Sequence, residues 1–230
     1  MKEISPSRSN LNNDNVIDNV MSSFQQIQSQ IQQNKIAAPA PAPAAPTERS
    51  RHEVIFPPSK IKVGANEFEV SLHAPPMSIL REFTHIFGPN ILPPNTSLFV
   101  IPTIQPSLVG SLLNWTNVVS LEKDRLLECF LNLCTSLIPQ ILPPHIFFDY
   151  IDPCSGLPML HPSNKIYDEV AGCSELLNLR VYNAGGCKVL THNEYGDGGY
   201  PATIFLGGER EEVMRFYQMV VNLYSGNNGT

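Results

Sequence analysis

Residues 179–206 read LRVYNAGGCKVLTHNEYGDGGYPATIFL. Three short segments rich in apolar and β-branched residues alternate here with two connections rich in Gly, Asn and Asp. This alternation is typical of antiparallel strands joined by tight turns. We therefore predict strands over 179–182, 187–191 and 202–206, connected through turns at 183–186 and 193–199.

The rest of the globular region mixes helical and extended patterns. Alternation of Phe68, Val70 and Leu72 predicts a strand, whereas apolar residues three and four positions apart predict a helix that Gly88-Pro89 ends. The same criteria predict strands over 67–73, 98–104 and 146–151, and helices over 77–87, 120–138, 167–177 and 209–224. Strands interleaved with helices and hairpin turns predict an α+β fold, in which helices pack on a mixed or antiparallel sheet.

The helix predicted over 120–138 is the longest of the four. Ser120 is expected to cap it, because acidic residues follow in its opening turns, where the helix dipole favours them. Its later part is almost wholly apolar, so we expect this helix to be central and covered on several sides. Its two cysteines, Cys129 and Cys134, are then small core residues.

Residues 1–47 differ in composition from everything that follows. They are rich in Asn, Gln and Ser and then enter an Ala/Pro tract. Such sequences predict a disordered, low-complexity tail that ends in a semi-rigid linker. Residues 48–225 then form one globular domain, and 226–230 a flexible C-terminus. Five apolar residues of the tail have helical spacing and form either a short helix that docks on a partner or a fluctuating one: Ile17, Val20, Phe24, Ile27 and Ile31.

Composition narrows the class of protein. The 230-residue chain has a formal net charge of -6 and scattered basic residues, so we expect no nucleic-acid partner, which would need clustered Lys and Arg. No stretch reaches the ~20 apolar residues of a membrane span, and no secretory pattern is present, so no membrane association is expected. Five cysteines without a Cys-x-x-Cys pair fit a reducing compartment. The predicted location is the cytoplasm; no clear transit peptide is visible, although the mitochondrion stays open.

The segment Gly185-Gly186-Cys187-Lys188 is the most suggestive of chemistry. Its glycines would let a large ligand approach the backbone, and the ammonium of Lys188 would favour the thiolate of Cys187. A thiolate is a soft donor suited to a transition metal. The alternative is an ordinary buried cysteine in a strand after a glycine turn. Strand alternation places Cys187 and His192 on opposite faces, which weakens a Cys-His catalytic dyad.

Other candidate positions favour structural roles. Asp152-Pro153-Cys154-Ser155-Gly156 has the composition of a turn, in which Pro fixes φ and Gly supplies a positive φ. Gly196-Asp197-Gly198-Gly199 lacks the order of a phosphate-binding loop and predicts a hairpin turn. The six histidines show no zinc-ligand spacing. Trp115 lies in a connection, where it either marks an interface or covers the core.

Two of these motifs carry a resemblance to a known family. The run Phe148-Asp149-Tyr150-Ile151-Asp152-Pro153-Cys154-Ser155-Gly156-Leu157 resembles the Phe-Ile-Asp-Pro-Ser-Ser-Gly-Leu signature of the methylmalonic aciduria and homocystinuria type D protein family. Residues 185–192 are similar to that family's Gly-Cys-Cys-Lys-Val-Ile-x-His. The likeness extends roughly over residues 51–205, and the two motifs together are specific.

The resemblance implies a fold related to the flavin nitroreductases, without flavin and without enzymatic activity. It implies an adaptor in cobalamin trafficking that complexes with the cobalamin-processing type C protein and helps direct the cofactor to methionine synthase and methylmalonyl-CoA mutase. The chain alone would bind no cofactor; a cysteine of the Cys-Cys pair would ligate the cobalt of cobalamin that the partner holds. The competing interpretation is a thiol- or flavin-dependent oxidoreductase of related fold, with Cys173 as the nearest resolving cysteine.

The chain departs from the family at the ligand position. Gly186 stands where the first cysteine of the pair is expected, and only Cys187 corresponds to the second. Either a small shift in register lets Cys187 ligate cobalt, or the protein assists transfer without a sulfur–cobalt bond. The expected cofactor-contacting residues are accordingly Cys187, Gly185 and Gly186.

Overall fold

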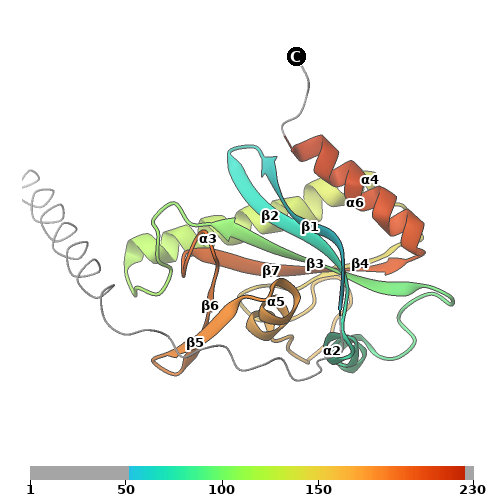
Figure 1. Ribbon diagram of the computed structural model, residues 1–230, viewed down its shortest axis with the longest axis horizontal. Helices are drawn as coiled ribbons and strands as arrows, with labels where there is room; N and C mark the ends of the chain where they lie inside the picture. Colours follow the sequence, from blue (N-terminus) through green and yellow to red (C-terminus); the bar gives the residue numbers. More distant parts are fainter. Residues whose placement is uncertain (1–51, 226–230) are drawn as a thin grey trace, which may run out of the picture. The chain divides into compact units, whose positions relative to one another are not determined.

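A five-stranded antiparallel sheet organises residues 52–225, which the computed structural model describes (Figure 1). The strand order is β1-β2-β3-β7-β4, and every neighbouring pair is antiparallel. The strands are β1 (Glu53–Val63), β2 (Asn66–Ala74), β3 (Ser97–Pro106), β4 (Phe147–Tyr150) and β7 (Gly199–Gly208). The predicted α+β class with an antiparallel sheet is confirmed. The tail and C-terminal predictions fall outside the described residues, as does the apolar stripe of the tail.

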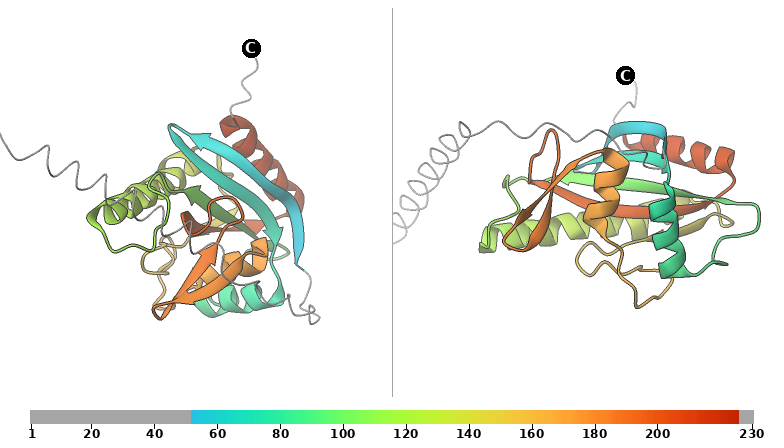
Figure 2. Two further views of the ribbon diagram at one scale, coloured as in Figure 1. Left: turned by 60° about the vertical axis from the view of Figure 1, so that its left-hand side comes forward. Right: turned by 60° about the horizontal axis from the view of Figure 1, so that its bottom comes forward.

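Both faces of the sheet are covered, and strand alternation decides which residue faces which layer. On β3, Leu98 and Val100 face one layer of helices, whereas Phe99 and Ile101 face the other. The first layer contains α2 (Met77–Phe87) and α5 (Glu169–Leu177). The second contains α6 (Arg210–Tyr224) and the later part of α3 (Asn117–Asn132) (Figure 2). Burial on both faces explains why the central strands read as continuous apolar runs.

The first strand was not predicted from the sequence. β1 contains Pro57-Pro58, which usually argues against a strand because proline donates no backbone hydrogen bond. β1 lies at the edge of the sheet, where a missing donor can face outward. Its pairing with β2 is irregular around the two prolines, with register shifts between Val54 and Ser59.

The longest helix begins one turn earlier than expected. The side chain of Thr116 accepts a hydrogen bond from the amide of Val119 at 3.3 Å, so Thr116 is the N-cap and the prediction of Ser120 was wrong. After Asn132 the helix continues through a π-helical turn, Leu133–Leu137, and a short α4, Ile138–Ile141. Its first half is exposed on one side rather than central. Cys134 is a core residue, as expected, and Cys129 is half-buried against the core.

The predicted hairpin exists as a separate two-stranded sheet. β5 (Arg180–Ala184) pairs with β6 (Cys187–Thr191), and only the third predicted strand, β7, belongs to the main sheet. The expected four-residue connection is in fact a two-residue turn, Gly185-Gly186, because Asn183 and Ala184 pair with β6. The likeness to flavin nitroreductases stays a prediction from the resemblance. Within the described chain, every helix is too short or too polar to cross a membrane.

Candidate functional site

The turn of the β5–β6 hairpin fixes the position of the candidate cysteine. Gly185 has φ of +58° and Gly186 has φ of +89°, and a two-residue turn with positive φ at both positions matches the right-handed twist of the strands. Nothing lies within 4 Å of a Cβ built on either glycine. The backbone conformation therefore favours glycine at both positions, most strongly at Gly186, and the space beyond the turn is open.

Cys187 is the first residue of β6, directly after this turn. Its thiol is free and exposed, and the residue opposite it in the ladder is the small Ala184. The structure thus brings the three predicted residues, Gly185, Gly186 and Cys187, together at one exposed tip. The alternative of a buried strand cysteine was wrong, because neither sheet nor helix covers this end of the hairpin.

Lys188 is engaged by a carboxylate. Its ammonium donates to Asp168 at 2.7 Å, and Asp168 also caps α5 by accepting from the amide of Ala171 at 3.0 Å. Burial acts to raise the pKa of Asp168, but these two hydrogen bonds and the charge of Lys188 outweigh it and lower the pKa. An exposed ion pair contributes little stability, so the main consequence is positional: it ties β6 to the start of α5.

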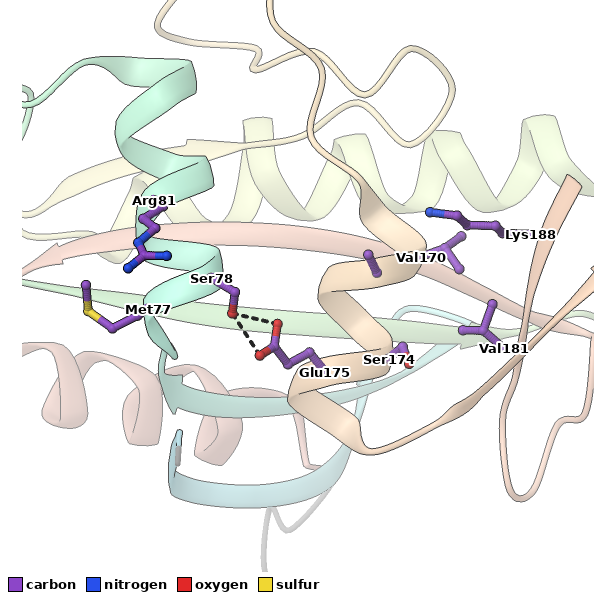
Figure 3. A pocket seen from close by; sticks show the side chains of 9 residues that line it. Met77, Ser78, Arg81, Val170, Ser174, Glu175, Val181 and Lys188 are labelled. Carbon is purple, nitrogen blue, oxygen red and sulfur yellow. Dashed lines mark hydrogen bonds between the residues drawn. The ribbon is translucent and has the colours of Figure 1, made fainter. Parts of the chain in front are cut away.

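A groove lies beside the hairpin, between α2 and α5 (Figure 3). Its volume is about 720 Å³. Within it, the hydroxyl of Ser78 donates to both carboxylate oxygens of Glu175, at 2.8 and 2.7 Å. The basic side chains Arg81 and Lys188 come from opposite sides of the groove. The lining residues are Met77, Ser78, Arg81, Val170, Ala171, Ser174, Glu175, Val181 and Lys188.

Sequence reasoning missed this groove. Its lining comes from α2, α5, β5 and β6, which meet only in the folded chain. The only local signal is helical spacing of small and polar residues, such as Ser174 three positions after Ala171, and that pattern is common on any exposed helix.

His192 is not a partner of Cys187. Its Nδ1 accepts hydrogen bonds from the amides of Glu194 and Tyr195, so its Nε2 carries the proton and donates to Glu69 at 3.1 Å. The imidazole is 6% exposed and stacks on Tyr195. The histidine has a structural role that joins the turn to β2, and the opposite-face placement of Cys187 and His192 stays a prediction.

Cys173 belongs to α5, and its side chain lies in the core. It is fully buried, and its thiol donates to Glu169 at 3.2 Å. Burial, followed by the nearby Glu169, raises the pKa of this thiol well above its usual value. A resolving cysteine must meet the exposed Cys187 as a thiolate or as an accessible sulfur. The position and chemistry of Cys173 fit neither requirement.

The signature motif forms a turn, as predicted. Asp152 accepts from the amides of Cys154 and Ser155 and from the Ser155 hydroxyl. Gly156 has φ of +73°, and a Cβ there would lie 2.4 Å from Ile166, so only glycine fits. The connection before β7 also turns, as predicted: the bridge between His192 and Gly196 closes a turn over 193–195, and residues 197–198 turn again before β7.

Asp149, inside the same motif, was not recognised. Its carboxylate is fully buried and accepts hydrogen bonds from four backbone amides and one imidazole nitrogen, at 2.7–3.0 Å. The donors are the amides of Tyr150, Met159, Leu160 and His161 and the His161 ring. Asp149 thereby holds the loop that follows β4.

Trp115 is 98% exposed, so the prediction that it covers the core was wrong and the interface alternative stays open. In residues 52–225, no three His, Cys, Asp or Glu side chains are grouped so that they could hold a metal ion.

Comparison with known proteins identifies the family. A family model described as methylmalonic aciduria and homocystinuria type D protein matches residues 2–215. The chain belongs to this family. It is 26% identical over 192 residues to a protein of Gallus gallus named cobalamin trafficking protein CblD, which covers 75% of this chain and 64% of that protein. The type D chain is also 26% identical to the Homo sapiens protein of that name over 138 residues, 60% of this chain and 45% of the relative. It spans about half to two thirds of the length of these relatives.

Proposed function

We propose that this type D protein is a non-enzymatic adaptor in cobalamin trafficking, which presents the thiolate of Cys187 to cobalamin held by a partner. Family membership and the printed names of the relatives support the trafficking role. The observation that carries the mechanism is the exposed, free thiol at the start of β6, beside an open glycine turn.

The geometry of the turn favours Cys187 as the ligand. Position 186, where the family has its first cysteine, has φ of +89° in this chain, a conformation that costs a non-glycine residue about 1–3 kcal/mol. Position 187 has strand geometry and an exposed side chain. A thiolate there is a soft donor that suits cobalt. The shift of the ligand by one residue thus keeps an unstrained hairpin.

The proposed partner is the cobalamin-processing type C protein, and the proposed destinations are methionine synthase and methylmalonyl-CoA mutase. The chain alone binds no cofactor in this proposal, and cobalamin is contacted only within the complex. The groove between α2 and α5 adjoins the hairpin through Lys188, so it can receive part of the partner or of its cargo. The proposed compartment is the cytoplasm, with the mitochondrion as the alternative.

The oxidoreductase alternative is disfavoured by the position of Cys173. A dithiol mechanism needs two sulfurs that can meet, whereas one is exposed on the hairpin and the other is buried against Glu169.

Titration calorimetry with cobalamin-loaded type C protein tests the function. We expect the full chain to bind the loaded partner, and the purified chain to show no flavin absorbance. The proposal fails if no complex forms at tens of micromolar protein. Stoichiometric flavin absorbance that is released on denaturation would instead support the reductase.

A further inference from the structure

Exposed apolar side chains are concentrated in one short segment. Fifteen large apolar residues lie exposed in the described part of the chain, and six of them fall between positions 108 and 121. Scattered exposed apolar residues are normal, but a cluster of this kind marks an interaction site. The 108–121 surface comprises Leu108, Val109, Leu113, Trp115, Val118 and Leu121.

Buried polar contacts hold the backbone of this segment in place. Glu122 is 6% exposed and accepts from the amide of Leu108 at 2.7 Å while it pairs with Arg125 at 2.7 Å. The Asp197 carboxylate accepts from the Ser111 hydroxyl at 2.9 Å, and the Asp197 carbonyl accepts from the amide of Leu112. The segment is therefore anchored, and its apolar side chains point outward from a preorganised backbone, which lowers the entropy cost of binding.

Trp115 does not pack against the helix that it precedes. It precedes the N-cap Thr116, a position from which an apolar residue usually packs on the fourth residue of the helix. That residue is Ser120, so no hydrophobic staple can form. The Lys123 ammonium lies over the ring, 6.0 Å from its centroid. The indole is thus almost fully exposed, with the Lys123 ammonium over one of its faces.

The surface has the size and chemistry of a protein interface. An aromatic side chain can bury about 150–250 Å². Trp115 is 98% exposed, so nearly all of this area is available for burial by a partner. With Leu108 at 78% and Leu121 at 68%, it supplies much of the ~800 Å² per partner that a standard complex needs. Charge does not favour a lipid surface, because Lys123 is followed by the exposed Asp124, whereas anionic membranes attract clusters of Lys and Arg.

The 108–121 segment lies at the same end of the sheet as the β5–β6 hairpin (Figures 1 and 2). Asp197, which holds Ser111, belongs to the connection that leads from β6 to β7. Burial and the nearby Asp197 carboxylate also raise the pKa of Tyr182 on β5. The connection that follows the hairpin is therefore hydrogen-bonded to the 108–121 segment, and a single partner could cover both.

We infer that the 108–121 surface is the protein-docking face of this chain, with Trp115 as its main anchor, and that its occupant is the protein that carries cobalamin to Cys187. This inference rests on the proposed function and adds to it the contact that brings the partner to the hairpin. Tryptophan is among the residue types that dominate binding energy at interfaces.

The single tryptophan of the chain gives a direct probe. Full-length protein labelled with 5-fluorotryptophan should show one ¹⁹F resonance, which shifts or broadens when unlabelled, cobalamin-loaded type C protein is added. Trp115→Ala should weaken binding in calorimetry about tenfold or more, and Leu121→Ser should weaken it less. Leu223→Ala removes a side chain that is 53% exposed on α6 and should leave affinity within twofold. Matching melting curves for all variants show that folding is unaffected.

The outcomes separate this inference from the proposed function. Binding by the wild type that neither shifts the ¹⁹F signal nor depends on Trp115 overturns the docking face and leaves the function intact. No binding by the wild type overturns both. A ¹⁹F shift that follows the concentration of this chain alone, with a change in its sedimented mass, assigns the surface to a second copy and overturns the inference. Binding of the labelled chain to phosphatidylserine vesicles through Trp115 overturns it in favour of a membrane.

Discussion

Asp149 shows how one buried charge can hold a loop. A carboxylate that is removed from water needs hydrogen-bond donors around it, and the five donors to Asp149 all come from residue 150 and from the loop end at 159–161. Charge-assisted hydrogen bonds of this kind are stronger than neutral ones. The signature motif therefore contributes an anchor as well as a turn.

Replacing Asp149 should destabilise the domain strongly. Asp149→Ala leaves several amides without an acceptor, and we expect the free energy of unfolding to fall by about 2–4 kcal/mol. Asp152→Ala, in the adjoining exposed turn, should cost only about 1 kcal/mol. Urea denaturation followed by circular dichroism measures both. Equal costs for the two variants would contradict the anchoring role of Asp149.

Glu169 is a half-buried acid whose carboxyl has fewer hydrogen-bond donors than that of Asp149. The residue is half-buried; its carboxyl accepts from the hydroxyl of Thr203 and from the thiol of Cys173, and its second oxygen is buried without a partner. Burial raises its pKa to about 7, although the two hydrogen bonds act in the opposite direction. A neutral carboxyl is therefore the form that the core accommodates best.

The raised pKa predicts a pH dependence of stability. Between the ordinary value of 4.5 and about 7, the folded chain holds a proton that the unfolded chain releases. This contribution is complete below pH 4.5 and is lost as the pH rises through 7, with a total of about 3 kcal/mol. Glu169→Gln should remove the loss, so the variant should gain stability over the wild type as the pH increases. Parallel curves from pH 5 to 8 would contradict the prediction.

The roles of individual residues differ in how far the sequence predicts them. Cys187 was recognised because a glycine pair and a lysine surround it in a specific motif. Asp149 and Glu169 were missed because the local sequence around an acid does not show whether its carboxyl is buried, and the fold brings most of its donors to it. The role of Trp115 was left open for the same reason. The indole is exposed because the helix residue on which it would usually pack is the small, polar Ser120.

At the scale of elements, the β5–β6 turn shows how backbone conformation limits sequence. Gly185 has φ of +58°, a left-handed helical value that asparagine tolerates, whereas Gly186 at +89° lies beyond that region. Neither position is crowded, so substitutions there test conformation alone.

The two glycines should therefore respond differently to substitution. Gly186→Val should destabilise the hairpin by about 1–3 kcal/mol, and amide exchange in β5 and β6 should accelerate accordingly. Gly185→Asn should change exchange little, because asparagine adopts the required conformation at low cost. If exchange is equally fast in both variants, the turn does not depend on positive φ at position 186.

Elements with strong local signals were predictable, and those decided by context were not. The helix over 77–87 and the strands around 67–73 and 202–206 follow directly from periodicity. β1 was missed because Pro57-Pro58 is tolerated only at a sheet edge, which the sequence does not identify. The N-cap was predicted at Ser120 and lies at Thr116. Both residue types can cap a helix, and the packing of Leu112 and Val119 in one cluster favours the earlier start.

At the scale of the whole molecule, helices cover both faces of the sheet. The candidate functional groups therefore lie on segments outside the sheet. In the described chain, the β5–β6 hairpin forms its own sheet, apart from the five-stranded one. The groove, the exposed thiol and the 108–121 surface all lie around this hairpin. The proposed transfer thus uses a rigid domain that presents one sulfur and one docking face.

The absorbance spectrum of the ternary complex tests the central claim that Cys187 supplies sulfur to cobalt. We predict that the full chain, mixed with cobalamin-loaded type C protein, produces a sulfur-to-cobalt band. Cys187→Ser should abolish the band and retain partner binding, because a hydroxyl is a harder and poorer donor. Cys154→Ser, which alters another exposed cysteine, should leave the band unchanged. A Cys187→Ser protein that still binds the partner and still shows the full band would contradict the account.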